Sequence, residues 1–236
     1  MTTYVLVHGA WHGGWCWQRV APDLRAAGHD VFAPTLTGVC ESAHLATPSV
    51  GLDTHILDVI GLIEKNELKD IVLLGHSYGG MVITGVGEKL HDRIKTIVYL
   101  DAFIPEDGQS LLSLQNDQAR MGMIMDTIQN GDGWLVTPRS PEYFGVKDQA
   151  NIDWINAQCT KQPLLTFMQP SRNAGTWKKI PRKAYIRAEG HPGAVFAPFG
   201  DMAKASKDWD YHGVACGHEI MIEMPRELSK ILLGLA

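Results

Sequence analysis

Short runs of branched apolar residues recur along the chain, and between them apolar residues follow the spacing of a helix. The runs at 4–7, 71–74 and 97–100 contain only aliphatic or aromatic side chains, which is typical of strands buried on both faces. In contrast, the apolar positions 52, 56, 59, 60 and 63 fall on one face of a helix. Strands that alternate with helices require a parallel sheet covered on both faces. The pattern therefore predicts an α/β fold.

The alternation of predicted strands and helices is interrupted in the middle of the chain. From about residue 106 to residue 180 the sequence has scattered tryptophans, methionines crowded at 121–125 and few strand signals. A strand pattern returns at 182–188. We interpret residues 1–105 and 181–236 as the core of one domain, and residues 106–180 as a mainly helical cap inserted into it. The length of 236 residues fits a single domain with such an insertion.

Composition and charge narrow the choice of partner and location. The net charge of −5 gives no electrostatic case for binding nucleic acid or an anionic membrane. No apolar run approaches the length of a membrane span, and Met1 leads directly into a strand without the basic segment of a signal peptide. The four cysteines are far apart, which argues against a zinc ribbon or a disulfide framework. We therefore expect a cytoplasmic protein.

One of the predicted strands leads into a motif that carries chemistry. The run 71–74 is followed by Gly75-x-Ser77-x-Gly79 and then by a helix-compatible segment, 81–90. Strand, Gly-x-Ser-x-Gly and helix in this order form the context of a nucleophile elbow. Its tight turn strains the backbone at the serine, and the glycines leave room for the neighbouring elements. The motif predicts Ser77 as a nucleophile, with a plain structural turn as the alternative.

Other groups with chemical potential also follow predicted strands. A glycine-rich turn at 9–14, Asp101, Glu189 and His218 each come after a strand signal. Because the carboxyl ends of parallel strands gather at one edge of a sheet, these groups are expected to meet Ser77 there. The glycine-rich turn lacks the Gly-x-Gly-x-x-Gly fingerprint of a dinucleotide site. We expect neither a cofactor nor a metal to be required.

Together these residues resemble the α/β-hydrolases. The closer resemblance is to the group of plant methylesterases, such as the salicylic-acid-binding methylesterases, with the hydroxynitrile lyases and their bacterial esterase relatives. It implies an α/β-hydrolase fold, with a mostly parallel sheet covered by helices on both faces and a helical cap inserted after the strand that follows the nucleophile helix. The resemblance rests on segments from both ends of the core: Val7-His8-Gly9-Ala10-Trp11-His12-Gly13-Gly14-Trp15-Cys16-Trp17, Leu36-Thr37-Gly38, Gly75-His76-Ser77-Tyr78-Gly79-Gly80, Tyr99-Leu100-Asp101-Ala102-Phe103 and Gly217-His218.

The resemblance assigns the base and the oxyanion hole. A serine needs an adjacent base, and in this fold the base follows the nucleophile and the acid along the chain. His218 fits this order. The oxyanion hole is expected to use the backbone N–H groups of Tyr78 and Ala10. Trp11 and Trp15, in the same glycine-rich turn, are the candidates for contact with substrate.

The acid of the triad has two candidates. Asp101 follows the strand that comes after the elbow helix, a placement that some α/β-hydrolases use, and we favour it. Glu189 is the alternative, because the plant relatives usually place the acid after the strand that corresponds to 183–188. Asp101 also has a structural explanation, since its carboxylate could cap the turn at 103–105.

The cap is expected to supply the walls of the substrate pocket, although apolar residues in such a segment more often pack onto the core. Methionine adapts to varied apolar shapes, which fits an aromatic or alicyclic substrate of medium size. The candidate wall residues are Met121, Met123, Met125, Ile128, Trp134, Phe144, Trp154, Phe167 and Met168.

These residues predict a serine hydrolase that cleaves a small to medium-sized carboxylic ester through an acyl-enzyme. A carbamate or amide hydrolase with the same triad is the alternative. A hydroxynitrile lyase would, by the resemblance, need threonine and lysine where this chain has Gly9 and Glu219. A non-catalytic small-molecule receptor is a further alternative, because a fold alone does not fix function. The expected partner is a small apolar or aromatic ester-like molecule, and the sequence indicates no oligomeric state.

Overall fold

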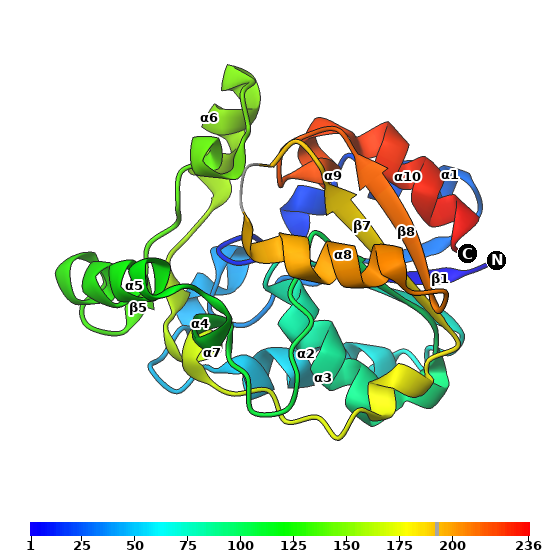
Figure 1. Cartoon of the computed structure of the whole chain (residues 1–236), viewed down its shortest axis with the longest axis horizontal. Helices are drawn as coiled ribbons and strands as arrows, with labels where there is room; N and C mark the ends of the chain where they lie inside the picture. The colour runs from blue at the N-terminus through cyan, green and yellow to red at the C-terminus, as the bar shows by residue number, and fades with distance from the viewer. Residues whose placement is uncertain (192–193) are drawn as a thin grey trace.

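Six parallel strands form the central sheet of the computed structural model, which describes residues 1–191 and 194–236 (Figure 1). The strand order is β2-β1-β3-β4-β7-β8, and each neighbouring pair is parallel. The carboxyl ends therefore lie at one edge, and the predicted α/β architecture is confirmed. The strands of this sheet are β1 Thr3–Val7, β2 Asp30–Phe32, β3 Ile71–His76, β4 Ile94–Leu100, β7 Arg182–Ala188 and β8 Trp209–Val214.

Successive side chains of the strands enter two separate apolar clusters, one on each face of the sheet. In β1, Val5 and Val7 belong to one cluster, whereas Tyr4 and Leu6 belong to the other. The helices of the core that contribute to the first cluster are α2 Leu52–Lys65, α3 Gly79–Leu90 and α8 Ala197–Ala205. Those that contribute to the second are α1 Ala21–Ala26, α9 Ile220–Glu223 and α10 Pro225–Gly234. Burial on both faces explains why the strands read as uninterrupted apolar runs.

Helix α8 was not predicted from the sequence. It lies between β7 and β8 and contacts both strands, and its segment Ala-Pro-Phe-Gly-Asp-Met-Ala-Lys-Ala mixes small, polar and turn-forming residues without a clear helical stripe. Among residues 1–191 and 194–236 no helix has the length and apolarity of a membrane span. The cytoplasmic location stays a prediction.

The segment between β4 and β7 is mainly helical, as its sequence indicates. Figure 1 shows α5 and α6 extending away from the sheet, while α4 and α7 lie closer to the core. Two short antiparallel strands, β5 Leu135–Val136 and β6 Gln162–Pro163, pair with each other within this segment. Its helices are α4 Leu111–Leu114, α5 Asp117–Asn130, α6 Gln149–Gln158 and α7 Leu165–Met168.

Candidate active site

Ser77 occupies a strained turn between β3 and α3. Its φ of 55° lies in the left-handed region, which costs a residue with a side chain on the order of 1–3 kcal/mol. Two backbone hydrogen bonds hold the turn: the N–H of Ser77 donates to Leu100, and its carbonyl accepts from Phe103, each at 3.2 Å. A Cβ on Gly75 would lie 2.5 Å from the carbonyl oxygen of Gly79, so this glycine cannot be replaced without a shift of the backbone. The predicted elbow geometry is present.

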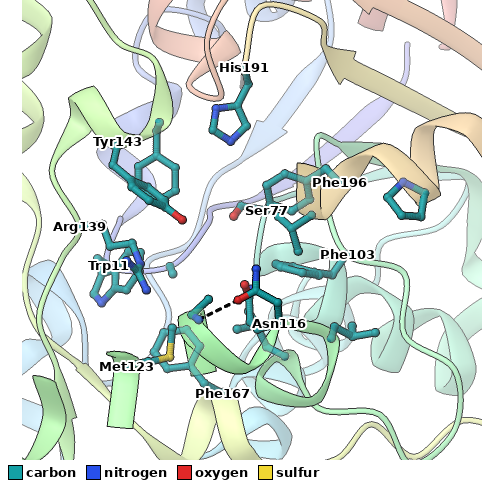
Figure 2. A pocket seen from close by; sticks show the side chains of 18 residues that line it. Trp11, Ser77, Phe103, Asn116, Met123, Arg139, Tyr143, Phe167, His191 and Phe196 are labelled. Carbon is teal, nitrogen blue, oxygen red and sulfur yellow. Dashed lines mark hydrogen bonds between the residues drawn. The ribbon is translucent and has the colours of Figure 1, made fainter. Parts of the chain in front are cut away.

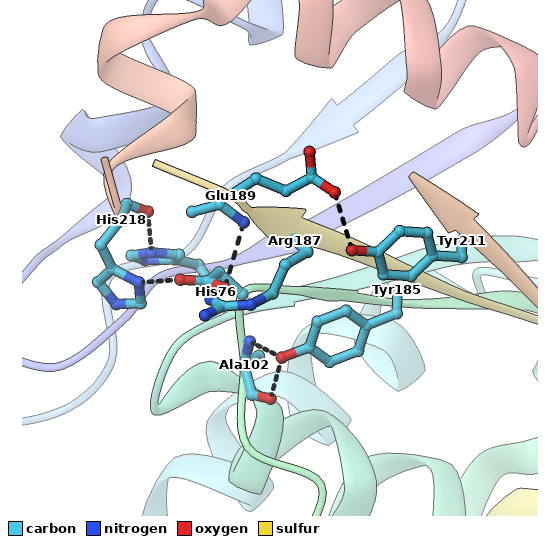
Figure 3. Close-up of polar contacts among 9 residues, drawn as sticks. His76, Ala102, Tyr185, Arg187, Glu189, Tyr211 and His218 are labelled. Atoms are coloured by element: carbon cyan, nitrogen blue, oxygen red, sulfur yellow. Dashed lines mark hydrogen bonds and ion pairs between the residues drawn. The ribbon is translucent and has the colours of Figure 1, made fainter. Parts of the chain in front are cut away.

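His218 and Asp101 meet at the carboxyl edge of the sheet (Figure 3). His218 Nδ1 donates to Asp101 Oδ2 at 2.7 Å, and both residues are almost fully buried. The other carboxylate oxygen, Oδ1, accepts from the Arg187 guanidinium and from the Ala188 N–H. This bonding fixes the tautomer of His218, because a carboxylate can only accept from the proton on Nδ1. The lone pair of His218 therefore lies on Nε2.

Burial governs the charge of this pair. It lowers the pKa of His218 well below the ordinary value, and the neighbouring His191 lowers it further. Burial also raises the pKa of Asp101, while the positive charge of Arg187 acts in the opposite direction. The imidazole is thus neutral near neutral pH, which is the state in which Nε2 can accept a proton.

Two aromatic rings hold the imidazole of His218. Phe144 stacks on it with the ring centroids 5.1 Å apart, and Phe196 stacks on it at 4.7 Å. The backbone N–H of His218 also donates to the carbonyl oxygen of Phe144 at 2.9 Å. The ring is therefore positioned by packing as well as by its hydrogen bond to the carboxylate.

Glu189, the other candidate acid, lies on the surface. Its carboxylate accepts a hydrogen bond from Tyr211 at 3.2 Å and points away from His218 (Figure 3). Among the described residues, the carboxylate of Asp101 accepts no hydrogen bond from the turn at 103–105. The structure thus brings Asp101, and not Glu189, to the imidazole.

A pocket of about 390 Å³ opens over Ser77 (Figure 2). Its walls come from the carboxyl edge of the sheet and from the segment between β4 and β7. Three of the predicted wall residues line it, whereas Met121, Met125, Ile128 and Met168 are exposed. Polar groups at the pocket are few and include Asn116, Arg139, Tyr143 and His191. The apolar walls include Trp11, Phe103, Met123, Phe144, Phe167 and Phe196.

The two tryptophans of the glycine-rich turn differ in position. Trp11 lines the pocket, and its φ of 64° shows that the turn takes a left-handed step there. Trp15 is not among the residues that line the pocket. Its ring stacks on His12 and packs edge-on against Trp154, with 5.1 Å between centroids in each case. The structure gives no support to the predicted contact of Trp15 with substrate.

The two backbone groups expected to form the oxyanion hole are available. Within residues 1–191 and 194–236, neither the N–H of Ala10 nor that of Tyr78 donates a hydrogen bond. Tyr78 directly precedes α3, where the first N–H groups of a helix have no partner inside the helix. Ala10 lines the pocket beside Ser77. Both groups remain proposals for the stabilisation of negative charge.

Arg187, His191 and Phe196 are site residues that the sequence did not reveal. Arg187 carried a signal, because a charge inside a strand predicted to be buried requires a partner. His191 and Phe196 fall between recognisable elements, and only the packing of the loop after β7 brings them to His218. Nothing in their spacing indicates this contact.

Comparison with known proteins places this site in a family. A model of the alpha/beta hydrolase family matches residues 4–231. The chain belongs to the α/β-hydrolase family. It is 42% identical over 243 residues to a carbendazim hydrolyzing esterase of Nocardioides sp. (strain SG-4G), with 100% of both chains covered. It is also 27% identical over 264 residues to methylesterase 10 of Arabidopsis thaliana, covering 99% of this chain and 91% of that one.

A solved structure shows the same α/β-hydrolase fold. An extracellular α/β-hydrolase from a Paenibacillus species, described as a homologue of tobacco salicylic acid binding protein 2, aligns with a TM-score of 0.87 and 23% identity. The alignment covers 99% of this chain and 98% of that chain. The family match and the named esterases identify this α/β-hydrolase as an enzyme of the carboxylesterase type. The resemblance to the plant methylesterase group is confirmed.

Proposed function

We propose that the protein is a serine hydrolase in which Ser77 is the nucleophile, His218 the general base and Asp101 the acid of the triad. The observation that carries this proposal is the 2.7 Å hydrogen bond from His218 to Asp101, at the same sheet edge as the strained serine. A serine hydroxyl is a weak nucleophile near neutral pH, and a neutral imidazole held by a carboxylate is the arrangement that activates it.

In the first half of the reaction, Ser77 Oγ attacks the carbonyl carbon of the substrate, and its proton passes to His218 Nε2. Asp101 stabilises the imidazolium that forms. The N–H groups of Ala10 and Tyr78 hold the oxyanion. The tetrahedral intermediate collapses when the alcohol departs with the proton from His218. Water then attacks the acyl-enzyme and gives a proton to His218, and His218 returns this proton to Ser77 Oγ as the acid is released.

The pocket favours a compact ester with an apolar or aromatic group. Its volume of about 390 Å³ and its many aromatic walls match a small-molecule site of the usual kind. A methyl carbamate is the second candidate, because the relative at 42% identity is named for carbendazim hydrolysis, and carbendazim is a methyl carbamate on a flat aromatic ring. The same triad cleaves either bond, with a carbamoyl group on Ser77 in the second case.

Hydroxynitrile lyase chemistry is disfavoured by the residue after the base. Glu219 is almost fully buried and faces the same small cavity as His218. A carboxylate at this position repels cyanide as it departs, whereas a lysine would attract it. Gly9 also lacks the hydroxyl of the threonine that the lyases need. Hydrolysis is therefore the reaction that the site supports.

A substrate comparison tests the proposal. Wild type and Ser77→Ala are assayed with an aryl acetate and with a methyl N-aryl carbamate, and release of the alcohol is followed for each. We expect wild type to cleave the acetate with the higher kcat/KM, because an ester carbonyl is more electrophilic than a carbamate carbonyl. Ser77→Ala is expected to lose at least a thousandfold on both substrates. Turnover of either substrate that survives in Ser77→Ala would contradict the proposal.

A further inference from the structure

A second, much smaller cavity lies behind Ser77. Its volume of about 10 Å³ has room for one water-sized atom, and its lining includes His12, His76, His218 and Glu219. It shares Ser77 and three other lining residues with the substrate pocket. The two cavities are therefore adjacent.

The imidazoles of His76 and His218 each present a bare lone pair to this cavity. His76 Nε2 donates to the carbonyl oxygen of His218 at 3.1 Å, so its Nδ1 is the unprotonated nitrogen. His218 Nδ1 donates to Asp101, so its Nε2 is the unprotonated nitrogen. Neither nitrogen has a hydrogen-bond partner in the described part of the chain.

The third candidate ligand at this cavity is the carboxylate of Glu219. Its Oε2 is buried and, like the two nitrogens, lacks a hydrogen-bond partner among the described residues. His12 Nε2 faces this oxygen at 3.4 Å, and His12 Nδ1 in turn donates to the carbonyl oxygen of Ala10 at 2.7 Å. One ligand atom from each of His76, His218 and Glu219 lies within 4.8 Å of the others. Two imidazoles and one carboxylate thus offer ligand atoms close to one another, and the carboxylate lies at ion-pair distance from His12, which a bound ion would replace as its partner.

Such a set of donor atoms fits a transition-metal ion. Two imidazole nitrogens and one carboxylate oxygen are ligands that Zn²⁺ takes, and three protein ligands leave one position open. Each ring also donates its other N–H to a carboxylate or a backbone carbonyl, which is the second-shell pattern of zinc histidines. A tetrahedral ion with bonds of about 2.1 Å needs its ligands about 3.4 Å apart, so a bound ion would draw together ligand atoms that lie within 4.8 Å of one another.

We propose that His76 Nδ1, His218 Nε2 and Glu219 Oε2 form a buried site for a divalent transition-metal ion such as Zn²⁺, and that the bound ion inhibits the enzyme. The ion takes the lone pair on His218 Nε2, which then cannot accept the proton of Ser77. The inhibition depends on the proposed role of His218 as the base. The binding of the metal ion does not depend on that role.

The binding test uses metal-free Ser77→Ala protein, so that it does not depend on turnover. Isothermal titration with Zn²⁺ compares this protein with the double variants that add Glu219→Gln or Glu189→Gln. We expect Glu219→Gln to weaken the tightest Zn²⁺ site at least tenfold, and Glu189→Gln, which removes a carboxylate from the surface, to leave it unchanged. His76→Asn in the same background removes a second ligand, so the test remains decisive if Glu219→Gln does not fold. Equal Zn²⁺ affinity in all variants would show that the cavity holds water only and would overturn the proposal.

The inhibition test uses the active enzyme. Zn²⁺ is expected to inhibit wild type, and the concentration for half inhibition is expected to rise at least tenfold in Glu219→Gln, measured against that variant's own metal-free rate. EDTA is expected to restore the wild-type rate. Zn²⁺ binding that depends on Glu219 but leaves the turnover of wild type unchanged would support the metal site and contradict the role of His218 as base.

Discussion

At the scale of single residues, Asp101 has two partners that make its position possible. A buried carboxylate is costly without compensation, and the Arg187 guanidinium and the Ala188 N–H supply it on one oxygen. The other oxygen is then free to orient His218 at 2.7 Å. Strand β7, after which the resemblance would place the acid, here supplies Arg187, the positively charged partner of Asp101.

Replacing Asp101 by its amide tests this assignment. Asp101→Asn keeps the shape of the side chain but removes the charge that stabilises the imidazolium. Its amide can present either an oxygen or an N–H group to His218 Nδ1, so it no longer fixes the tautomer of the ring. We expect kcat for an aryl acetate to fall roughly ten-thousand-fold, as when a triad carboxylate becomes an amide elsewhere. Glu189→Gln is the matched control and is expected to stay within about threefold of wild type, because that side chain lies on the surface. Equal losses in both variants would contradict the assignment.

At the scale of elements, helix α3 does more than carry the elbow at its first turn. Near its end, Glu88 accepts hydrogen bonds from the backbone N–H groups of Ala174 at 2.9 Å and Trp177 at 3.2 Å. These groups belong to the end of the segment inserted between β4 and β7. One side chain of α3 thus ties the insertion back to the core, on the side away from Ser77.

The contribution of the Glu88 hydrogen bonds to the free energy of unfolding is expected to depend on pH. Burial alone raises the pKa of Glu88, but hydrogen bonds from Thr176, Trp177 and Ala174 outweigh it and hold the pKa below the ordinary value of 4.5. A carboxylate with a lowered pKa stabilises the fold above its ordinary pKa, and this contribution is lost as the pH falls through the lowered value. In urea unfolding, Glu88→Gln is expected to cost about 1 kcal/mol at pH 7, because the group is partly exposed, and progressively less as the pH falls below the ordinary pKa of 4.5. A constant difference across this range would contradict the tie.

The sequence predicts best those elements that are fully buried and whose pattern lies within one short segment of the chain. Strands β1, β3 and β7, the elbow and helix α2 lie within two residues of where the sequence predicts them, because apolar runs and helical spacing reflect burial directly. The run at 97–100 marks only the second part of β4. Helix α8 and the position of Trp15 could not be predicted in this way. Both depend on which distant segment packs against them: β7 and β8 for the helix, His12 and Trp154 for the ring. The limits 106 and 180 of the predicted cap stay a prediction.

At the scale of the whole molecule, the pocket joins segments that are far apart in the sequence. Ser77 and Trp11 come from the sheet edge, Met123 from α5 and Phe196 from the start of α8. The groups at the sheet edge were predicted because each of them follows a strand. Of the pocket wall that lies opposite the sheet edge, the sequence predicted only a part. The wall opposite Ser77 therefore depends on how distant segments of the chain pack together.

This pocket size leads to a prediction about chain length. A well-packed ligand fills roughly three quarters of a cavity, so a volume of about 390 Å³ suits p-nitrophenyl acetate or butyrate and is too small for the dodecanoate. We expect kcat/KM for the dodecanoate to be at least tenfold lower than for the butyrate, measured below the concentration at which either ester forms micelles. Met123→Ala, which enlarges the wall, is expected to narrow this difference. A preference for the dodecanoate in wild type would contradict the assignment of the pocket.

A fluorophosphonate probe tests most directly whether His218 and Asp101 activate Ser77. Wild type, Ser77→Ala, His218→Ala and Asp101→Asn are incubated with the probe, and intact mass is followed over time after circular dichroism has shown each to be folded. We predict one adduct on wild type, none on Ser77→Ala and adducts that form at least a hundredfold more slowly on the other two variants. No adduct on folded wild type, or equal labelling of wild type and His218→Ala, would contradict the account.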